Sequence, residues 1–240
     1  MRTAFAAPIV AEAKGSHDVV TATDRASEAL LAEMLLGEGL PGDVLLGEEG
    51  GARGALDGAS RLWVVDPIDG TVNFANGIPL FAVAIGLLVD REPLLGVVYD
   101  PIRDELFVAE RGGGATMNGA PIRVSEKRSL SQSVCAVSLQ RGAGMPIVES
   151  IAYAARSTRA LGSSAIALTW VAAGRIDAYV QDANLSLWDI AGPGAIAVEA
   201  GAVLEGLDGE PWLDLRAIDR AHIIASAPGI VGELRTTIGR

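Results

Sequence analysis

The stretch Trp63-Val64-Val65-Asp66-Pro67-Ile68-Asp69-Gly70-Thr71 is the most informative part of this chain. Its apolar run stops at two carboxylates, Asp66 and Asp69, and a glycine and a hydroxyl follow at once. Pro67 favours extended geometry in the residue before it, so we expect a strand over 62–65 that ends at the first carboxylate. Hard divalent cations prefer carboxylate ligands, and the glycine and hydroxyl suit a phosphate beside the cation. Because Asp, Pro and Gly also form turns, an ordinary turn explains these residues equally well unless further ligands exist.

The composition of the chain limits its class. Its 240 residues are 50% hydrophobic, which suffices for a sizeable core in one compact unit. With 19 Lys and Arg against 30 Asp and Glu, the formal net charge is -11, so we expect no nucleic-acid or membrane partner. An anionic substrate is still compatible with this charge, because bound cations invert the local field. The single cysteine, Cys135, allows no intrachain disulfide and suits a reducing compartment, so we expect a cytoplasmic protein.

The first ten residues faintly resemble a signal peptide. Their apolar part is short, is broken by Pro8 and is soon followed by Glu12 and Lys14. We therefore expect a truncated first helix there instead. No run approaches the roughly 20 apolar residues of a membrane span.

The first half of the chain predicts one helix and an antiparallel meander. The helix follows Asp24, and its apolar side is formed by Ala26, Leu30, Leu31, Met34 and Leu35. A short strand over 44–46 and a loop over 50–60 come next. Turn signals then separate strand-like runs at 62–65, 82–89, 94–99 and 105–109, with a hairpin turn at Asn118-Gly119.

The second half alternates strands and helices, which predicts α/β layers. Strands are expected near 134–139, 157–161, 178–180 and 202–204, with helices near 145–155, 165–173 and 190–200. The chain should therefore divide into an N-terminal α+β lobe over 1–128 and a C-terminal α/β lobe over 129–240, packed as one unit.

Further carboxylates stand at other element ends. Glu48 and Glu49 lie between glycines after a short strand, Asp189 precedes a predicted helix, and Asp24 opens the first one. Each has an ordinary explanation, since a charged pair in a loop is usually solvated and a lone Asp before a helix is usually an N-cap. Together with the carboxylates of the opening stretch, they make a joint case for a divalent cation site.

These segments resemble the inositol monophosphatase family of Mg²⁺-dependent, lithium-sensitive phosphatases. The resemblance implies an α/β fold with an α+β N-terminal half, in the layered αβαβα sandwich of the inositol monophosphatase and fructose-bisphosphatase type. It also implies a small phosphorylated substrate and a homodimer. The matching motifs occur in the family's order: Asp18 to Asp24 (Asp-Val-Val-Thr-Ala-Thr-Asp), Gly47-Glu48-Glu49, Asp66 to Phe74, Gly162-Ser163-Ser164-Ala165, Trp188-Asp189-Ile190-Ala191-Gly192 and Glu199-Ala200-Gly201.

The resemblance also implies residue roles. It implies two or three Mg²⁺ ions, with Mn²⁺ as a substitute, held by Glu48, Asp66, Asp69, Asp189 and the backbone carbonyl of Ile68. The implied catalytic residues are Asp24, Glu48 and Thr71; Asp24 and Thr71 would orient or deprotonate the attacking water, and Glu49 would support a metal-bound water. The implied substrate contacts are Asp69, Gly70, Thr71, Gly162, Ser163, Asp182 and Asp189.

The resemblance predicts a Mg²⁺-dependent phosphomonoesterase. Its substrate would be a small phosphorylated polyol or sugar such as inositol 1-phosphate, attacked directly by a metal-activated water. Inositol-specific members place a Glu just after the strand Asp177-Ala178-Tyr179, where this chain has Gln181 and then Asp182, so we expect Asp182 to substitute.

Several alternatives stay open. Residues 71–79 also resemble archaeal-type fructose-1,6-bisphosphatases, and histidinol-phosphatases and 3′-phosphoadenosine 5′-phosphate phosphatases share the metal site. A haloacid-dehalogenase-type phosphatase would use an Asp nucleophile, but the spacing of Asp66 and Asp69 differs from Asp-x-Asp-Gly-Thr. An inactive, metal-free regulatory relative is the non-enzymatic alternative, and it should have lost a ligand that this chain keeps.

Overall fold

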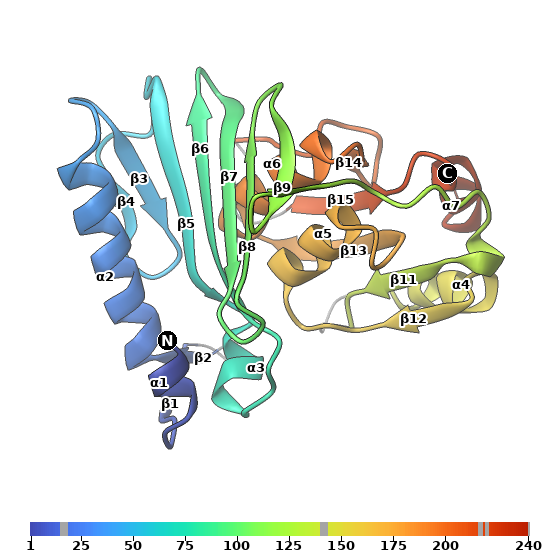
Figure 1. Ribbon diagram of the computed structural model, residues 1–240, viewed down its shortest axis with the longest axis horizontal. Helices are drawn as coiled ribbons and strands as arrows, with labels where there is room; N and C mark the ends of the chain where they lie inside the picture. The colour runs from blue at the N-terminus through green and yellow to red at the C-terminus, as the bar shows by residue number, and fades with distance from the viewer. Residues whose placement is uncertain (15–18, 140–143, 216–217, 219–220, 240) are drawn as a thin grey trace.

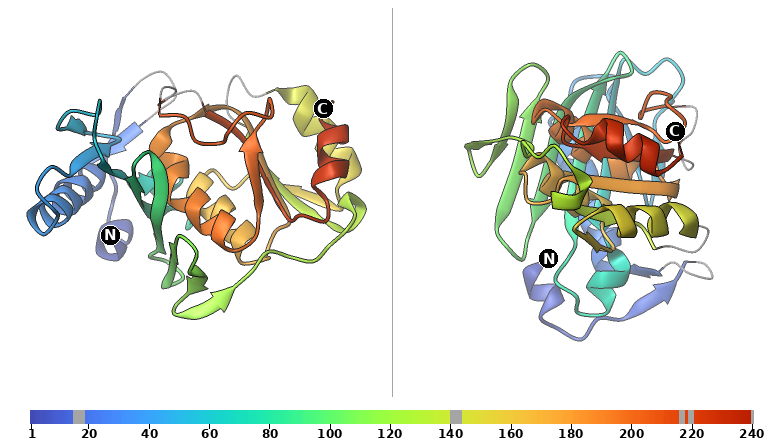
Figure 2. Two further views of the ribbon diagram at one scale, coloured as in Figure 1. Left: turned by 90° about the horizontal axis from the view of Figure 1, so that it is seen from above. Right: turned by 90° about the vertical axis from the view of Figure 1, so that its right-hand side faces the viewer.

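The computed structural model describes residues 1–14, 19–139, 144–215, 218 and 221–239 (Figure 1). Asp18, part of the first motif above, lies outside the described residues. Sheets and helices alternate in five layers along the longest axis, and the view from above in Figure 2 shows the same order. The outer helices are α2 (Ala22–Gly37) on one side and α4 (Met145–Ala154) with α7 (Val231–Thr237) on the other; α5 (Ser164–Ala172) and α6 (Leu187–Glu199) lie between the sheets. The predicted αβαβα sandwich is confirmed.

The larger sheet has eight strands in the order β10-β9-β8-β7-β6-β5-β3-β4. Its bounds are β3 (Val44–Gly47), β4 (Gly51–Arg53), β5 (Arg61–Asp69), β6 (Ala82–Val89), β7 (Glu92–Asp100), β8 (Glu105–Glu110), β9 (Gly114–Met117) and β10 (Ala120–Ile122). The meander from β5 to β10 is antiparallel, as predicted, and only β3 and β5 pair in parallel in this sheet. The loop prediction for 50–60 is wrong at β4, because the glycines there close a hairpin on β3.

The smaller sheet has five strands in the order β12-β11-β13-β15-β14. Its bounds are β11 (Val134–Val137), β12 (Ser157–Arg159), β13 (Ala178–Leu185), β14 (Val203–Gly206) and β15 (Ala221–Ser226), and the 3₁₀ helix η1 (Leu130–Gln132) precedes β11. β11 runs parallel to β12 and β13, whereas β15 is antiparallel to both of its neighbours. Neither β15 nor α7 was predicted from the sequence.

The N-terminal segment packs beneath the opening stretch of the sequence. It forms the short α1 (Arg2–Phe5), as expected, and then the hairpin of β1 (Ala11–Ala13) and β2 (Val19–Thr21). The ring of Phe5 lies 5.8 Å from that of Phe74 and 4.9 Å from that of Phe81. Together with buried Ile68, these rings form a small core under β5 and α3 (Thr71–Ala75).

The buried face of α2 differs from the prediction. Leu30 and Met34 are 56% and 54% exposed, whereas Asp24 and Glu28 are buried with Ala32. Only Leu31 and Leu35 of the predicted apolar side contact the core. The tertiary partners of the two carboxylates, described below, therefore override the apolar pattern in orienting this helix.

Helix α6 crosses the larger sheet at very short range. A Cβ atom on Gly192 would lie 2.3 Å from the carbonyl oxygen of Ile85, and one on Gly96 would lie 2.3 Å from the carbonyl oxygen of Gly192. Gly86 pairs with Gly96 across β6 and β7, so three glycines meet at the crossing point. Because no side chain fits there, these glycines set the height of α6 above the sheet and with it the position of Asp189, one turn earlier.

The other end of α6 is tied to the larger sheet by Glu199. Its two carboxylate oxygens accept the backbone N–H groups of Gly112 and Gly114, each at 3.0 Å. We expect Glu199→Ala to lower the free energy of unfolding by about 1 kcal/mol, because the partly buried N–H of Gly114 loses its partner, whereas the exposed N–H of Gly112 can bond to water. Denaturant titration would measure this loss, with the exposed Glu110→Ala as the control. A loss no larger than that of the control would contradict the role of Glu199 as a tie.

No helix in the described part of the chain combines the length and apolarity needed to cross a membrane.

Candidate active site

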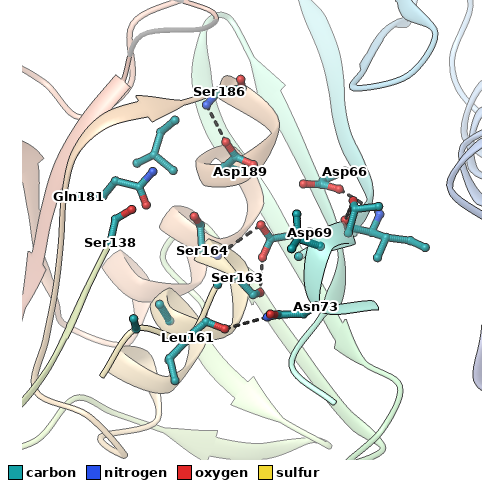
Figure 3. A pocket seen from close by; sticks show the side chains of 18 of the residues that line it. Asp66, Asp69, Asn73, Ser138, Leu161, Ser163, Ser164, Gln181, Ser186 and Asp189 are labelled. Atoms are coloured by element: carbon teal, nitrogen blue, oxygen red, sulfur yellow. Dashed lines mark hydrogen bonds between the residues drawn. The ribbon is translucent and has the colours of Figure 1, made fainter. Parts of the chain in front are cut away.

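A cavity of about 960 Å³ lies where β5, α3, α5 and α6 meet (Figure 3). One part of its wall is acidic and includes Glu48, Asp66, Asp69 and Asp189. Another part is neutral and combines Ser138, Tyr179 and Gln181 with apolar side chains. The arrangement offers a charged region and an uncharged region to one ligand.

The opening stretch of the sequence supplies two of these carboxylates through a bulge. Strand β5 was predicted to end at Asp66, but it continues to Asp69. Asp66 pairs with Ala84 and Asp69 with Ala82 on β6, so two residues of β5 oppose one of β6 between these pairs. Pro67 has no N–H for the ladder, which favours such a bulge. The bulge turns the ends of both aspartates toward the cavity.

Three aspartates gather in the acidic part of the cavity. Asp66, Asp69 and Asp189 each offer a carboxylate oxygen, and these atoms all lie within 4.8 Å of one another. Figure 3 shows Asp66 and Asp69 reaching from β5 toward Asp189 on α6. Burial raises the pKa of Asp66 well above its ordinary value, and the charges of Glu48, Asp69 and Asp189 raise it further. Burial and the charge of Asp69 raise the pKa of Asp189 as well.

This crowding of acidic groups suits a cation. Buried like charges raise the free energy of the fold unless a positive charge sits between them. A hard divalent cation takes carboxylate oxygens as ligands, so the donor set fits Mg²⁺ or Mn²⁺.

Asp69 also fixes the start of α5. One of its oxygens accepts the N–H of Ala165 at 2.7 Å and the hydroxyl of Ser163, and the other accepts the N–H of Ser164 at 3.3 Å. Burial raises the pKa of Asp69, although these hydrogen bonds oppose the shift. Gly162 and Ser163 line the cavity beside it, so the structure brings this pair of predicted substrate contacts to the site.

Asp24 and Asp189 occupy the same position in their helices. From the sequence, each was expected before or at a helix start, but both are the third helical residue, and the N-caps are Thr21 and Ser186. Asp24 accepts the N–H of Thr21 at 2.8 Å, and Asp189 accepts the N–H of Ser186 at 2.6 Å. Each is thus the acidic member of a capping box, which pins its carboxylate at the helix end.

Asp24 is linked to Thr71 in a buried pair. The Thr71 hydroxyl lies 3.2 Å from a carboxylate oxygen of Asp24 and 2.9 Å from the carbonyl oxygen of Ile68. Thr71 and Ile68 line the cavity. Gly70 is in the left-handed region at φ 94°, and a Cβ atom there would lie 2.9 Å from the carbonyl oxygen of Leu80, so only glycine suits this turn.

Glu48 and Glu49 occupy the turn between β3 and β4. Glu48 lines the cavity but lies outside the cluster of three aspartates. The ammonium group of Lys14 lies 3.2 Å from Glu48 and 2.9 Å from Glu49. Burial alone would lower the pKa of Lys14, but its hydrogen bonds to these carboxylates and their charges outweigh that and raise it.

Asn73 has a structural role that was not predicted from the sequence. Its side-chain amide donates to the carbonyl oxygens of Leu80 at 2.7 Å and Leu161 at 2.8 Å. It therefore ties α3 to the segment that leads into α5 (Figure 3). A polar residue in the middle of a short apolar helix was the available signal.

The structure does not bring Asp182 to the cavity. Its carboxylate accepts the backbone N–H of Gly144 at the start of α4. Gln181 lines the cavity instead, is 2% exposed and accepts a hydrogen bond from the Tyr179 hydroxyl. Side chains alternate along a strand, so the two neighbours on β13 face opposite ways.

Comparisons with known proteins identify the family of this chain. The family model of the inositol monophosphatase family matches residues 1–237. An inositol-1-monophosphatase of Mesorhizobium japonicum is 41% identical over 211 residues, covering 82% of this chain and 75% of that protein. The Nus factor SuhB of Pasteurella multocida is 36% identical over 231 residues, covering 94% and 84%. The crystal structure of the extragenic suppressor protein suhB from Bartonella henselae superposes with a TM-score of 0.87 at 33% identity, covering 97% and 89%. The chain belongs to the inositol monophosphatase family.

Proposed function

We propose that this protein is a Mg²⁺-dependent phosphomonoesterase acting on a small phosphorylated polyol or sugar such as inositol 1-phosphate. Family membership supports a phosphatase activity. The observation that carries the proposal is the cluster of Asp66, Asp69 and Asp189 at one end of a cavity with a neutral far wall.

The metal ligands in this proposal are the three clustered aspartates together with Glu48 and the carbonyl of Ile68. Mg²⁺, when bound, lowers the pKa of water and offsets the charge of a phosphate. The raised pKa values of Asp66 and Asp189 support the assignment, because a cation favours their ionised forms. We propose two or three ions per site.

The chain's own groups hold the remaining reactants. We propose that Thr71 and Asp24 orient the attacking water. The Thr71 hydroxyl donates to Asp24, so its oxygen is held at the cavity wall, where it can accept a hydrogen bond from the water. Glu49 would assist from the β3–β4 turn. The backbone N–H groups of Gly70 and Thr71 would bind the phosphate, with Gly162 and Ser163 beside it. Most of the rate enhancement then comes from positioning and electrostatics.

A phosphate-release assay tests the proposal. We expect Mg²⁺-dependent hydrolysis of inositol 1-phosphate that lithium inhibits, and slower hydrolysis of fructose 1,6-bisphosphate, histidinol phosphate and 3′-phosphoadenosine 5′-phosphate. A clear preference for one of the other three substrates would replace inositol phosphate as the assignment. No release from any phosphate monoester at millimolar Mg²⁺ would overturn the phosphatase proposal.

A regulatory role is the second candidate. The observation in its favour is the relative named Nus factor SuhB. This chain keeps every predicted carboxylate ligand, which favours the enzyme. Calorimetric titration separates the two: Mg²⁺ binding in the millimolar range or tighter supports the enzyme, and its absence supports the regulatory alternative. A homodimer and a cytoplasmic location stay predictions from the sequence.

A further inference from the structure

We propose that Glu28 is a positioning residue that holds the turn carrying Glu48 in its place at the metal site. The proposal rests on the function proposed above. More broadly, the buried polar face of α2 holds together the separate segments that supply the ligands. The capping-box and metal-ligand assignments above give Glu28 no role.

The contacts of Glu28 are unusual for a glutamate in the middle of a helix. The residue is 2% exposed, and its two carboxylate oxygens accept the backbone N–H groups of Glu49 and Gly50, each at 2.7 Å. Hydrogen bonds from backbone N–H groups to a carboxylate are stronger than neutral ones. One side chain therefore holds two consecutive peptide groups of the β3–β4 turn.

The turn itself is shaped to receive this carboxylate. A Cβ atom on Gly47 would lie 2.5 Å from the carboxylate carbon of Glu28, and one on Gly50 would lie 2.6 Å from its Oε1. Gly47 and Gly50 flank Glu48 and Glu49, so the carboxylate sits directly against the backbone of the acidic pair. Any shift of Glu28 is transmitted to Glu48.

Glu28 acts with two other polar residues on the same face of α2. Asp24 contacts Thr71, and the Ser27 hydroxyl donates to the carbonyl oxygen of Pro67 at 3.3 Å. Positions 24, 27 and 28 are spaced three and four apart, so they share one face of the helix. That face contacts the bulge of β5, the start of α3 and the β3–β4 turn, which are distant in sequence.

Burying an ionised carboxylate is unfavourable unless its partners compensate, so apolar residues would hold α2 on the sheet at a lower cost. The polar face is explained if it fixes the positions of the β5 bulge, the start of α3 and the β3–β4 turn relative to one another. Glu48 and Asp66 line the same cavity, so the position of the turn sets how close the Glu48 carboxylate lies to the clustered aspartates. Loss of the Glu28 contacts should let Glu48 move away from them and weaken cation binding.

The test compares Glu28→Gln with wild type and with Glu33→Gln, an exposed glutamate on the same helix. The glutamine has one acceptor oxygen, and its NH₂ group opposes the second backbone donor. We expect the Kd for Mg²⁺, measured by calorimetry, to rise about 10–100-fold, as for residues that support metal ligands. The kcat at saturating Mg²⁺ should stay close to wild type, and amide exchange at Glu49 and Gly50 should accelerate without metal. The control should match wild type in all three measurements.

A folded Glu28→Gln protein with wild-type Mg²⁺ affinity would overturn the proposal. If this variant does not fold, Gly50→Ala provides the second test. Its methyl group would lie 2.6 Å from Oε1 of Glu28 and displace the carboxylate from the turn, so the same rise in Kd is expected. A wild-type protein that binds no Mg²⁺ would instead count against the proposed function, so the two failures are distinguishable.

Discussion

The Asp66→Asn protein is expected to lose phosphatase activity and, without metal, to melt at a higher temperature than wild type at neutral pH. Asp66 is a proposed metal ligand in the acidic cluster, so activity should fall more than about 100-fold, since even residues that only support ligands contribute about 10–100-fold. Its Oδ1 accepts the N–H of Ile68 at 3.0 Å, and the asparagine oxygen can keep that bond.

The stability change follows from the raised pKa of Asp66. Below the unfolded pKa of about 3.9, the group is neutral in both states and has no effect on the fold. As pH rises, the unfolded chain ionises first while the folded protein retains the proton, so wild type loses stability until the pH passes the folded pKa. Asparagine does not ionise, so the variant avoids this loss of stability. Each 1 kcal/mol gained in the free energy of unfolding raises the melting temperature by about 2–4 °C in a chain of this length.

Melting curves of both proteins from pH 4 to pH 8, with a chelator and with Mg²⁺, provide the measurement. The difference should vanish at the acid end and grow with pH, and Mg²⁺ should reverse the order by stabilising wild type alone. The exposed Asp57→Asn serves as the control and should match wild type. A metal-free Asp66→Asn protein less stable than wild type at pH 8, or one with near-normal turnover, would refute the assignment.

Gly192→Ala is expected to lower the free energy of unfolding more than any other substitution proposed for this protein. The new methyl group would lie 2.3 Å from the carbonyl oxygen of Ile85 and 2.7 Å from its carbonyl carbon. Both are backbone atoms in a central strand, so the helix must lift rather than a side chain rotate. We expect a loss of about 3 kcal/mol or more, at the upper end for overpacking. Because α6 carries Asp189, the affinity for Mg²⁺ should fall as well.

Gly232→Ala provides the matched control for this prediction. Gly232 lies in α7, and a Cβ atom there has no neighbour within 4 Å. An alanine in a helix gains about 0.5–1 kcal/mol over glycine, so this variant should be slightly more stable than wild type. Urea titration of both variants measures the two changes. Equal stability of Gly192→Ala and Gly232→Ala would refute the tight crossing of α6 over the sheet.

Local patterns predicted most of the elements and failed where tertiary contacts dominate. The strands of the meander were predictable because apolar runs and turn residues alternate along them. The buried face of α2 was not predictable, because Asp24 and Glu28 have hydrogen-bond partners 20 or more residues away in the chain, and no periodicity reveals those partners. The extent of β5 was misjudged because a proline normally ends a strand, whereas here it sits in a bulge.

By itself, the sequence determined the order of the acidic motifs, and through their resemblance to a family it predicted the layered fold and the chemistry of the cavity. Those properties depend on which residues are present and how they are spaced. Only the tertiary structure decided which carboxylates meet, since Asp69 and Asp189 are joined by the packing of α6 on a glycine crossing. It also decided that Gln181 rather than Asp182 faces the cavity, because the direction of a side chain on β13 is set by the pairing of that strand.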